Sequence, residues 1–389
     1  LYDAGGGQDT RGGGQPLPAT PAASDPATPG ASGGRSGAGA GTSGGSMARL
    51  AKPAKRISIR EIARRAGVST ATVSMVLNDN PKITEATRQK VRTVIDRVGY
   101  QPNWIAQSLS SKYTRVIGIL LPTLRHALAD PYFGELISGI CDRAARLGHK
   151  VTLESAKPDF IREKRHLELF DRRFIDGALC IGFNDRHVFL KDFAAGGHPM
   201  IVVNNQFDPW GVDQVVCDYR SGADQVMTYL QQLGHEKIGL IYGSLDVYTS
   251  RIIAEVFRHR MPGLDESWMA DGRFTEEHGI AAAAELLDRH PDLTAVFAGN
   301  DKMALGAMRH LAQRGIKVPE QVSVVGFDDI PYSQFVTPAL TTVHLPFYEA
   351  GDLACERLIQ RIRGKEDRVN ETLSTHLVLR ESTGLAPRP

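Results

Sequence analysis

The stretch SIREIARRAGVSTATVSMVLN, residues 58–78, decides how the N-terminal part of this chain folds. Apolar residues recur at helical spacing over 59–66. Ser58 and Glu61 stand three residues apart, as in a capping box, where each side chain bonds a backbone N–H at the start of a helix. Gly67 comes next, and glycine readily takes the left-handed conformation that ends a helix. The pattern therefore predicts a short helix closed by a tight turn.

A second short helix is predicted to begin after Ser69, a residue type that caps helix starts. Its buried face should consist of Val73, Val76 and Leu77. The outward face is small, polar or flexible and comprises Thr70, Ala71, Thr72, Ser74 and Met75. Two helices joined by a glycine-containing turn are typical of a helix-turn-helix, whose second helix enters the DNA major groove. A helical hairpin used only for packing would give the same local pattern.

A third amphipathic helix is predicted from Thr84 to Gly99, which makes residues 47–102 a small three-helix domain. Residues 103–115 follow a proline and hold one short helical segment, WIAQSL at 104–109, before a polar and basic run. A helix this short is unstable alone and needs a partner surface. We expect 103–115 to be a hinge helix and linker.

The charge of the chain is unevenly distributed. Residues 47–115 hold 14 Lys and Arg against 4 Asp and Glu, a net charge of +10, whereas residues 116–389 hold 30 against 37, a net charge of −7. This asymmetry favours a polyanion-binding head on an acidic body. Residues 1–46 are Gly, Ala, Ser, Thr and Pro with almost no large apolar side chain, so we expect them to be disordered. We hypothesise that the native protein starts at Met47 and that 1–46 is an upstream artefact.

The cysteines and the hydropathy exclude several protein classes. Four widely separated cysteines, without a CxxC pair, predict neither a disulfide framework nor a zinc site. No apolar run reaches the roughly 18 residues of a membrane helix, and the N-terminus lacks a signal-peptide pattern. We therefore expect a cytoplasmic protein that does not contact a membrane.

From residue 116 onward, buried-type strands alternate with helices. The predicted strands are 116–121, 150–154, 177–181, 199–204, 237–242, 295–298 and 322–327, and the predicted helices are 132–147, 161–173, 186–195, 221–233, 249–260, 276–289 and 301–314. This alternation predicts right-handed βαβ units and parallel sheets. Residues 116–389 should thus form an α/β core of two doubly wound subdomains, with a ligand site in the cleft at the carboxyl ends of their strands.

The chain resembles the lactose-repressor (LacI/GalR) family of bacterial transcription regulators from about Ser58 to Gly384. The motifs that carry the resemblance are IREIARRAGVSTATVSMVLN, VGYQPNWIAQSL, VIGILLP, DPYF, DGALCIG, HPMIVVNN, VFAGNDKMALGAM, VPEQVSVVGFDD and TPALTTVHLP. The resemblance implies a three-helix DNA-binding head and a bilobed, periplasmic-binding-protein-like core that binds a small molecule and dimerises.

The resemblance also implies which residues contact DNA. Thr70, Ala71 and Met75 match the base-reading positions; many members have Arg at the third, whereas Met75 offers only an apolar contact, such as one with a thymine methyl group. Met75 could instead pack inward. Phosphate contacts would come from Ser69, Thr72, Ser74 and Asn78. In the hinge, Leu109 matches a residue that wedges into the minor groove beside Ala106; the alternative is that Leu109 is only a linker residue.

For the effector, the resemblance implies a cleft site on strand ends and helix starts. The matching positions are Tyr132, Phe133, Asn204, Arg251, Phe274, Asn300 and Asp328. The residues after Arg251 depart from the family pattern, because the usual Gly-aromatic pair is absent. Asn300-Asp301 could also act as helix caps, and Asp328-Asp329 as a turn. Arg together with carboxylates and carboxamides suits a hydroxyl-rich ligand, and aromatic faces suit sugar rings or purines, so a sugar or a related metabolite is expected.

The sequence thus predicts an effector-controlled repressor that binds a pseudo-palindromic operator as a homodimer. We expect no catalytic residues, no cofactor and no metal. A solute-binding protein would have the same body, but the basic head argues against it. An enzyme is the other alternative; the sequence has no GxxxxGK[ST], G-x-S-x-G, HExxH or GxGxxG after a strand. A dimer is favoured over a tetramer because no heptads follow Gly384.

Overall fold

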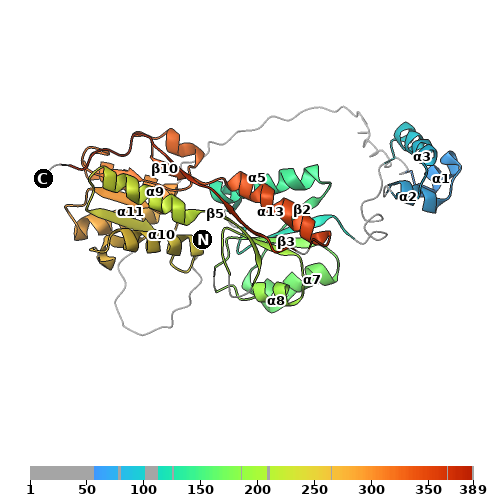
Figure 1. The fold of residues 1–389 in the computed structure, drawn as a ribbon, viewed down its shortest axis with the longest axis horizontal. Coiled ribbons are helices and arrows are strands. Elements are labelled where there is room, and N and C mark those ends of the chain that lie inside the picture. Colours follow the sequence, from blue (N-terminus) through green and yellow to red (C-terminus); the bar gives the residue numbers. More distant parts are fainter. Residues whose placement is uncertain are drawn as a thin grey trace, which may run out of the picture. The chain divides into compact units, whose positions relative to one another are not determined.

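The computed structural model describes residues 57–77, 80–100, 113–124, 127–184, 186–207, 211–263, 265–365 and 367–387. They belong to two compact units, a helical head and an α/β core (Figure 1). Some predictions fall outside the described residues and stay predictions. They concern the tail 1–46, residue Asn78, and the hinge residues 103–112, which include Ala106 and Leu109. No helix in these ranges is long and apolar enough to cross a membrane.

The head consists of α1 (Ile59–Ala66), α2 (Thr70–Leu77) and α3 (Glu85–Val98). Its core is formed by Ile62, Ala63, Ala66, Val73, Val76 and Val91, all nearly inaccessible to solvent. Gly67 and Gly99 end the first and third helices at φ 60°, in the left-handed region that favours glycine. The helix-turn-helix predicted from the sequence is therefore present, with the expected turn.

The predicted capping box at the start of α1 is wrong. Ser58 stands at the N-cap in extended conformation, but its side chain makes no capping hydrogen bond. The Glu61 carboxylate instead accepts from Arg64 and Arg65, both at 2.6 Å. A charge-assisted bond to two guanidinium groups is stronger than a bond to one neutral backbone N–H, so Glu61 turns along the helix.

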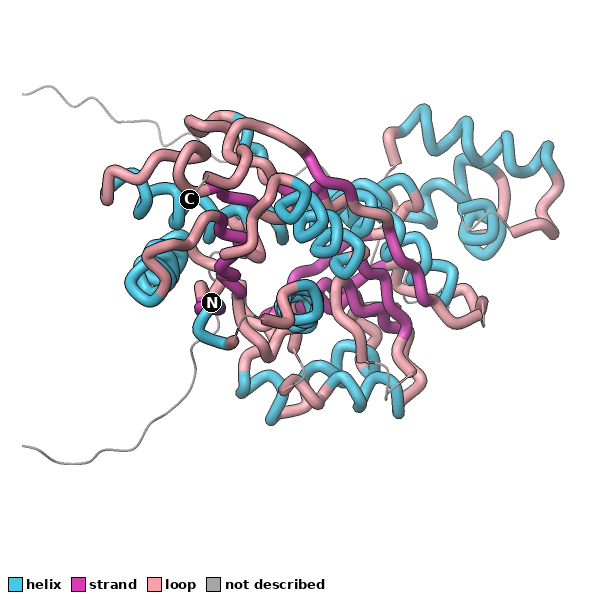
Figure 2. Tube along the Cα trace, turned by 60° about the vertical axis from the view of Figure 1, so that its left-hand side comes forward, coloured by secondary structure: helices cyan, strands magenta, loops and turns pink. Residues whose placement is uncertain are grey.

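The core contains two parallel sheets (Figure 2). The first sheet has the order β11-β5-β4-β3-β1-β2, and the second has the order β7-β6-β8-β9. The first sheet comprises β1 (Val116–Leu121), β2 (Lys150–Ser155), β3 (Gly177–Ile181), β4 (Met200–Val203), β5 (Asp213–Cys217) and β11 (Asn370–Leu373). The second comprises β6 (Ile238–Tyr242), β7 (Met269–Asp271), β8 (Ala295–Ala298) and β9 (Ser323–Val325).

Helices flank both sheets. The N-subdomain, built on the first sheet, has α5 (Pro131–Arg146), α6 (Pro158–Arg162), α7 (Arg165–Asp171), α8 (Leu190–Ala195) and α13 (Phe347–Ile362). The C-subdomain has α9 (Tyr219–Gln232), α10 (Tyr248–Arg260), α11 (Glu276–Arg289) and α12 (Asp301–Gln313). The helix predicted over 161–173 is two helices, α6 and α7, separated where Lys164 takes φ 55°. The helix predicted from 186 begins only at Leu190.

The chain crosses between the subdomains more than once. After β10 (Thr342–His344) it returns to the N-subdomain for α13 and β11, then runs back to β12 (His376–Val378), which pairs antiparallel with β10. In the N-subdomain α13 packs on α5 so closely that a Cβ on Gly351 would lie 2.1 Å from the Leu136 carbonyl oxygen. This crossing sets the position of α5, whose first turn faces the cleft described next.

Candidate functional site

The recognition helix α2 has a fixed start and an accessible outer face. The Ser69 hydroxyl oxygen accepts a hydrogen bond from the Thr72 backbone N–H at 3.0 Å, which confirms Ser69 as the helix cap. Thr70 and Ala71 are exposed, and Met75 is half-buried. Val73 and Val76 take the fully buried face, so Met75 is not a core residue of the head.

A basic surface accompanies this helix. Arg60, Arg64 and Arg65 on α1 are exposed. Arg64 and Arg65 both donate hydrogen bonds to the Glu61 carboxylate, and these bonds lower the pKa of that carboxyl group to about 2. Glu61 is therefore ionised at any physiological pH and offsets part of the positive charge of α1.

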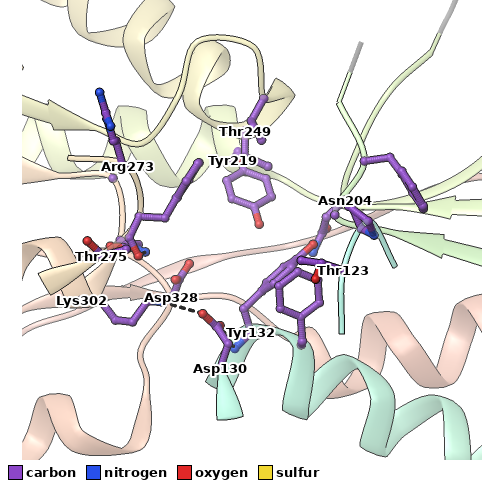
Figure 3. Close-up of a pocket in the computed structure, with 18 residues that line it drawn as sticks. Thr123, Asp130, Tyr132, Asn204, Tyr219, Thr249, Arg273, Thr275, Lys302 and Asp328 are labelled. Carbon is purple, nitrogen blue, oxygen red and sulfur yellow. Dashed lines mark hydrogen bonds and ion pairs between the residues drawn. The ribbon is translucent and has the colours of Figure 1, made fainter. Parts of the chain in front are cut away.

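A cavity of the core lies between the two subdomains at the carboxyl ends of their strands (Figure 3). Its volume is about 100 Å³, which is room for several water molecules at about 10–15 Å³ each. Its lining consists of Pro122, Thr123, Asp130, Tyr132, Phe133, Gly182, Phe183, Asn204, Tyr219, Val247, Thr249, Arg273, Phe274, Thr275, Gly299, Asn300, Lys302 and Asp328. The structure thus brings together six of the seven effector residues predicted from the sequence.

Aromatic rings form one wall of this cavity. Tyr132 and Phe133, in the first turn of α5, meet edge to face with ring centroids 4.8 Å apart. Tyr132 also meets Phe347 of α13 edge to face at 5.0 Å. Such edge-to-face pairs are favourable beyond their burial. The contact with Phe347 therefore helps to hold the Tyr132 ring in place.

Asn204 supplies a polar group without a partner. It follows β4 with φ 53°, a left-handed conformation that is strained for a residue with a side chain. Its side-chain oxygen accepts from the Cys217 backbone N–H at 2.8 Å, while its buried side-chain amide nitrogen has no hydrogen-bond partner within the described part of the chain. A buried donor left unpaired costs free energy, and this nitrogen lacks the hydrogen bond that buried polar groups usually make.

Asn300 has the capping role considered for it, and its role toward a ligand stays a prediction. Its side-chain oxygen accepts from the Met303 backbone N–H at 2.8 Å and caps α12, and the residue also lines the cavity. Asp328, which follows the neighbouring strand β9, also lines the cavity and has φ 114°. Desolvation raises the pKa of Asp328 well above its ordinary value, Asp301 and Asp130 raise it further, and Lys302 opposes them. Asp328 is followed by Asp329, which is engaged by Arg380 at 2.6 Å and His344 at 3.1 Å.

The neighbouring Asp301 is a structural residue. Its carboxylate accepts from Ser333, Thr342 and the Ile330 backbone N–H, and the residue is fully buried. Burial raises its pKa to about 6 in spite of these bonds. Within the described ranges, no three His, Cys, Asp or Glu side chains cluster as a metal site would require.

The assignment of Arg251 is not supported, because Arg251 is not among the residues that line the cavity. Its guanidinium lies 3.4 Å from the Leu245 carbonyl oxygen, while Val247 and Thr249 occupy the cavity side of the start of α10. Arg273, in the loop after β7, brings a guanidinium-bearing residue to the lining instead. Sequence reasoning also missed Asp130 and Lys302. Asp130 could have been found as the N-cap of α5, since it directly precedes Pro131 and Tyr132.

Comparison with known proteins agrees with both units. Residues 58–103 match the family described as bacterial regulatory proteins, lacI family, and residues 227–383 match a periplasmic binding protein-like domain. The HTH-type transcriptional repressor PurR of Haemophilus influenzae (strain PittEE) is 33% identical over 340 residues, covering 84% of this chain and 98% of that protein.

Two solved structures are similar over the same span. The Lac repressor dimer bound to operator and the anti-inducer ONPF has a TM-score of 0.74 at 26% identity, covering 85% of this chain and 100% of that one. The complex of the transcriptional regulator CelR with cellobiose has a TM-score of 0.65 at 30% identity, with 84% and 100% covered. These relatives are transcription regulators rather than enzymes. With its helix-turn-helix head and its two-subdomain core, this chain belongs to the LacI family of bacterial transcription regulators.

Proposed function

We propose that this protein is a repressor that binds a pseudo-palindromic operator as a homodimer and responds to a small molecule held in the core cavity. The observation that carries the proposal is the pairing of an exposed recognition-helix face with a cavity that contains an unpaired amide donor. The domain boundaries at residues 47–102, 103–115 and 116–389 are part of this proposal. So is the location in the bacterial cytoplasm, at the nucleoid when DNA is bound.

In this proposal Thr70, Ala71 and Met75 read base edges. The exposure of the first two supports direct contact, and the half-buried Met75 presents a methyl-bearing end of low polarity. Thr72 and Ser74 contact phosphates with Ser69 and Asn78, which positions the helix without specifying sequence. The minor-groove roles of Ala106 and Leu109 remain proposals for residues outside the described part of the chain.

The proposed effector is a sugar or a related hydroxyl-rich ring. Asn204 would donate a hydrogen bond, Asp328 would accept one, and the Tyr132 and Phe133 rings would cover an apolar ring face. Phe274 and Asn300 would complete the contacts. The cellobiose found in the similar CelR structure supports this ligand class. The volume of the cavity, about 100 Å³, favours a single ring over a longer chain in the conformation seen here.

Two measurements test this function. Selection of binding sites from random duplex DNA with the full chain should recover an inverted repeat; recovery of no repeat would contradict dimeric operator binding. Repeating the selection with Met75→Arg should introduce a guanine preference at one position of each half-site, because arginine pairs bidentately with guanine. Met75→Leu is the matched control and should leave the preferred sequence unchanged.

A thermal-shift screen of monosaccharides and nucleosides tests the effector. A true effector should raise the melting temperature and change operator affinity in the same concentration range. A ligand that raises the melting temperature without any effect on operator binding would contradict its role as the effector.

A further inference from the structure

Within the described residues, ion pairs cross from the N-subdomain to the C-subdomain around the cavity. Asp130, before α5, binds the Lys302 ammonium group of α12 at 2.5 Å, and Arg186, after β3, binds Asp246, after β6, at 2.5 Å. The Asp130–Lys302 pair is drawn as a dashed line in Figure 3. Both link segments that belong to different sheets, so both must break when the subdomains separate.

The environment of the two pairs separates them energetically. The side chains of Lys302 and Asp130 are only 17% and 10% exposed, whereas those of Arg186 and Asp246 are 76% and 43% exposed. An exposed pair contributes little because water and salt screen it. A largely buried pair is costly to break, since one charge is then left desolvated without its partner. The Asp130–Lys302 pair therefore contributes more than the Arg186–Asp246 pair to the free energy needed to separate the subdomains.

Asp130 also has a second bond. One of its carboxylate oxygens accepts from the Tyr132 backbone N–H at 3.0 Å and caps α5, while the other binds Lys302. On the opposite side, Lys302 lies in the first turn of α12, two residues after its cap Asn300. The pair thus joins the starts of two cavity-lining helices, one from each subdomain.

We propose that the Asp130–Lys302 ion pair is a latch that keeps the two subdomains closed over the cavity before any effector binds. This inference rests on the proposed effector cavity, because it assigns the latch to that cavity. It gives Asp130 and Lys302 a positioning role: they fix the angle between subdomains that an effector then alters.

The test measures opening without effector or DNA. A cysteine placed in the cavity wall by Thr123→Cys, in a full-length chain carrying Cys141→Ser to remove the exposed thiol, reports opening through its labelling rate with an aromatic disulfide reagent. Lys302→Met should increase the labelling rate about tenfold, because the free energy lost with this pair should lie between that of an exposed pair and that of a fully buried pair. Asp130→Asn should do the same, since asparagine still caps α5.

Two further comparisons make the result specific. The double variant should label no faster than either single variant, because both changes remove the same pair. Lys237→Met is the matched control: it breaks the exposed pair of Lys237 with Asp292 inside the C-subdomain and should leave the rate unchanged. Equal rates in Lys302→Met and its parent, or additive effects in the double variant, would overturn the latch. The labelling rates are measured without effector, so they do not depend on the outcome of the effector screen. The latch and the proposed effector function can therefore be refuted independently.

Discussion

Replacing Gly351 with alanine places a methyl group where α13 crosses α5. The new Cβ would lie 2.1 Å from the Leu136 carbonyl oxygen and 3.0 Å from its carbonyl carbon, so the partner that must move is helix backbone rather than a flexible side chain. Forcing atoms into a packed core costs about 1–3 kcal/mol, and often more when backbone must shift. The gain in helix propensity from glycine to alanine, up to about 1 kcal/mol, opposes this cost.

The net expectation for Gly351→Ala is a loss of about 1–2 kcal/mol in the free energy of unfolding. At roughly 2–4 °C per kcal/mol for a unit of this size, the melting temperature should fall by about 2–8 °C. Effector affinity should fall as well, because α5 carries Tyr132 and Phe133 into the cavity. Calorimetric melting of the full chain, with and without effector, measures both effects.

Gly134→Ala is the matched control, for which the melting temperature should not fall. Gly134 lies in the same helix α5, but a Cβ there would meet nothing within 4 Å. Only the propensity gain remains, so the melting temperature should stay level or rise by about 1–3 °C. If both variants shifted the melting temperature equally, close packing between α5 and α13 would not be the cause.

A buried carboxyl group, the unpaired donor of the cavity and the basic head each give a further prediction. Burial raises the folded-state pKa of Asp301 to about 6, so its contribution to stability is complete below about pH 4 and is lost as the pH rises to 6 and above. Relative to Asp301→Asn, the native chain should lose on the order of 2–3 kcal/mol of unfolding free energy between those limits in denaturant titrations. A difference in unfolding free energy that does not change with pH would contradict this pKa. Asn204→Ala should weaken effector binding about tenfold or more by calorimetry, since it removes the unpaired donor; unchanged affinity would show that the donor does not bind the effector. Operator affinity should fall steeply with salt, with a log–log slope set by the number of phosphate contacts, and a shallow slope would contradict a basic DNA-binding head.

Local signals explain which parts of the fold could be predicted from the sequence. The ends of the first and third helices of the head are marked by Gly67 and Gly99, and most parallel strands of the core appear as buried apolar runs. The choice of Glu61 between a backbone N–H and two guanidinium groups is a competition that spacing alone does not resolve. The strands β5 and β11 were missed because pairing across more than a hundred residues stabilises NETL at the sheet edge beside DQVVC, which also pairs with β4.

The candidate site divides in the same way. Six predicted effector positions lie at strand ends or helix starts, where the topology of parallel sheets forces them together, and all six line the cavity. Arg251 lies within the first turn of α10, where the rotation of the helix decides which side chains face the cavity, and the sequence does not specify that rotation. Lys302 was missed because its partner Asp130 is 172 positions away and only the closed arrangement of the subdomains brings them together.

The contacts of α5 indicate where the two subdomains can influence each other. Its C-terminal half is tied within the N-subdomain, where Arg143 and Arg146 both bind Asp352 of α13. Its first turn is tied to the C-subdomain through the latch of Asp130 and Lys302. A change in the angle between subdomains therefore pulls on the start of α5 while its remainder is held, and the cavity residues Tyr132 and Phe133 stand in that first turn. An effector that touches these rings would act on the same turn that the latch controls, so this turn is one route by which effector binding would change the angle between the subdomains.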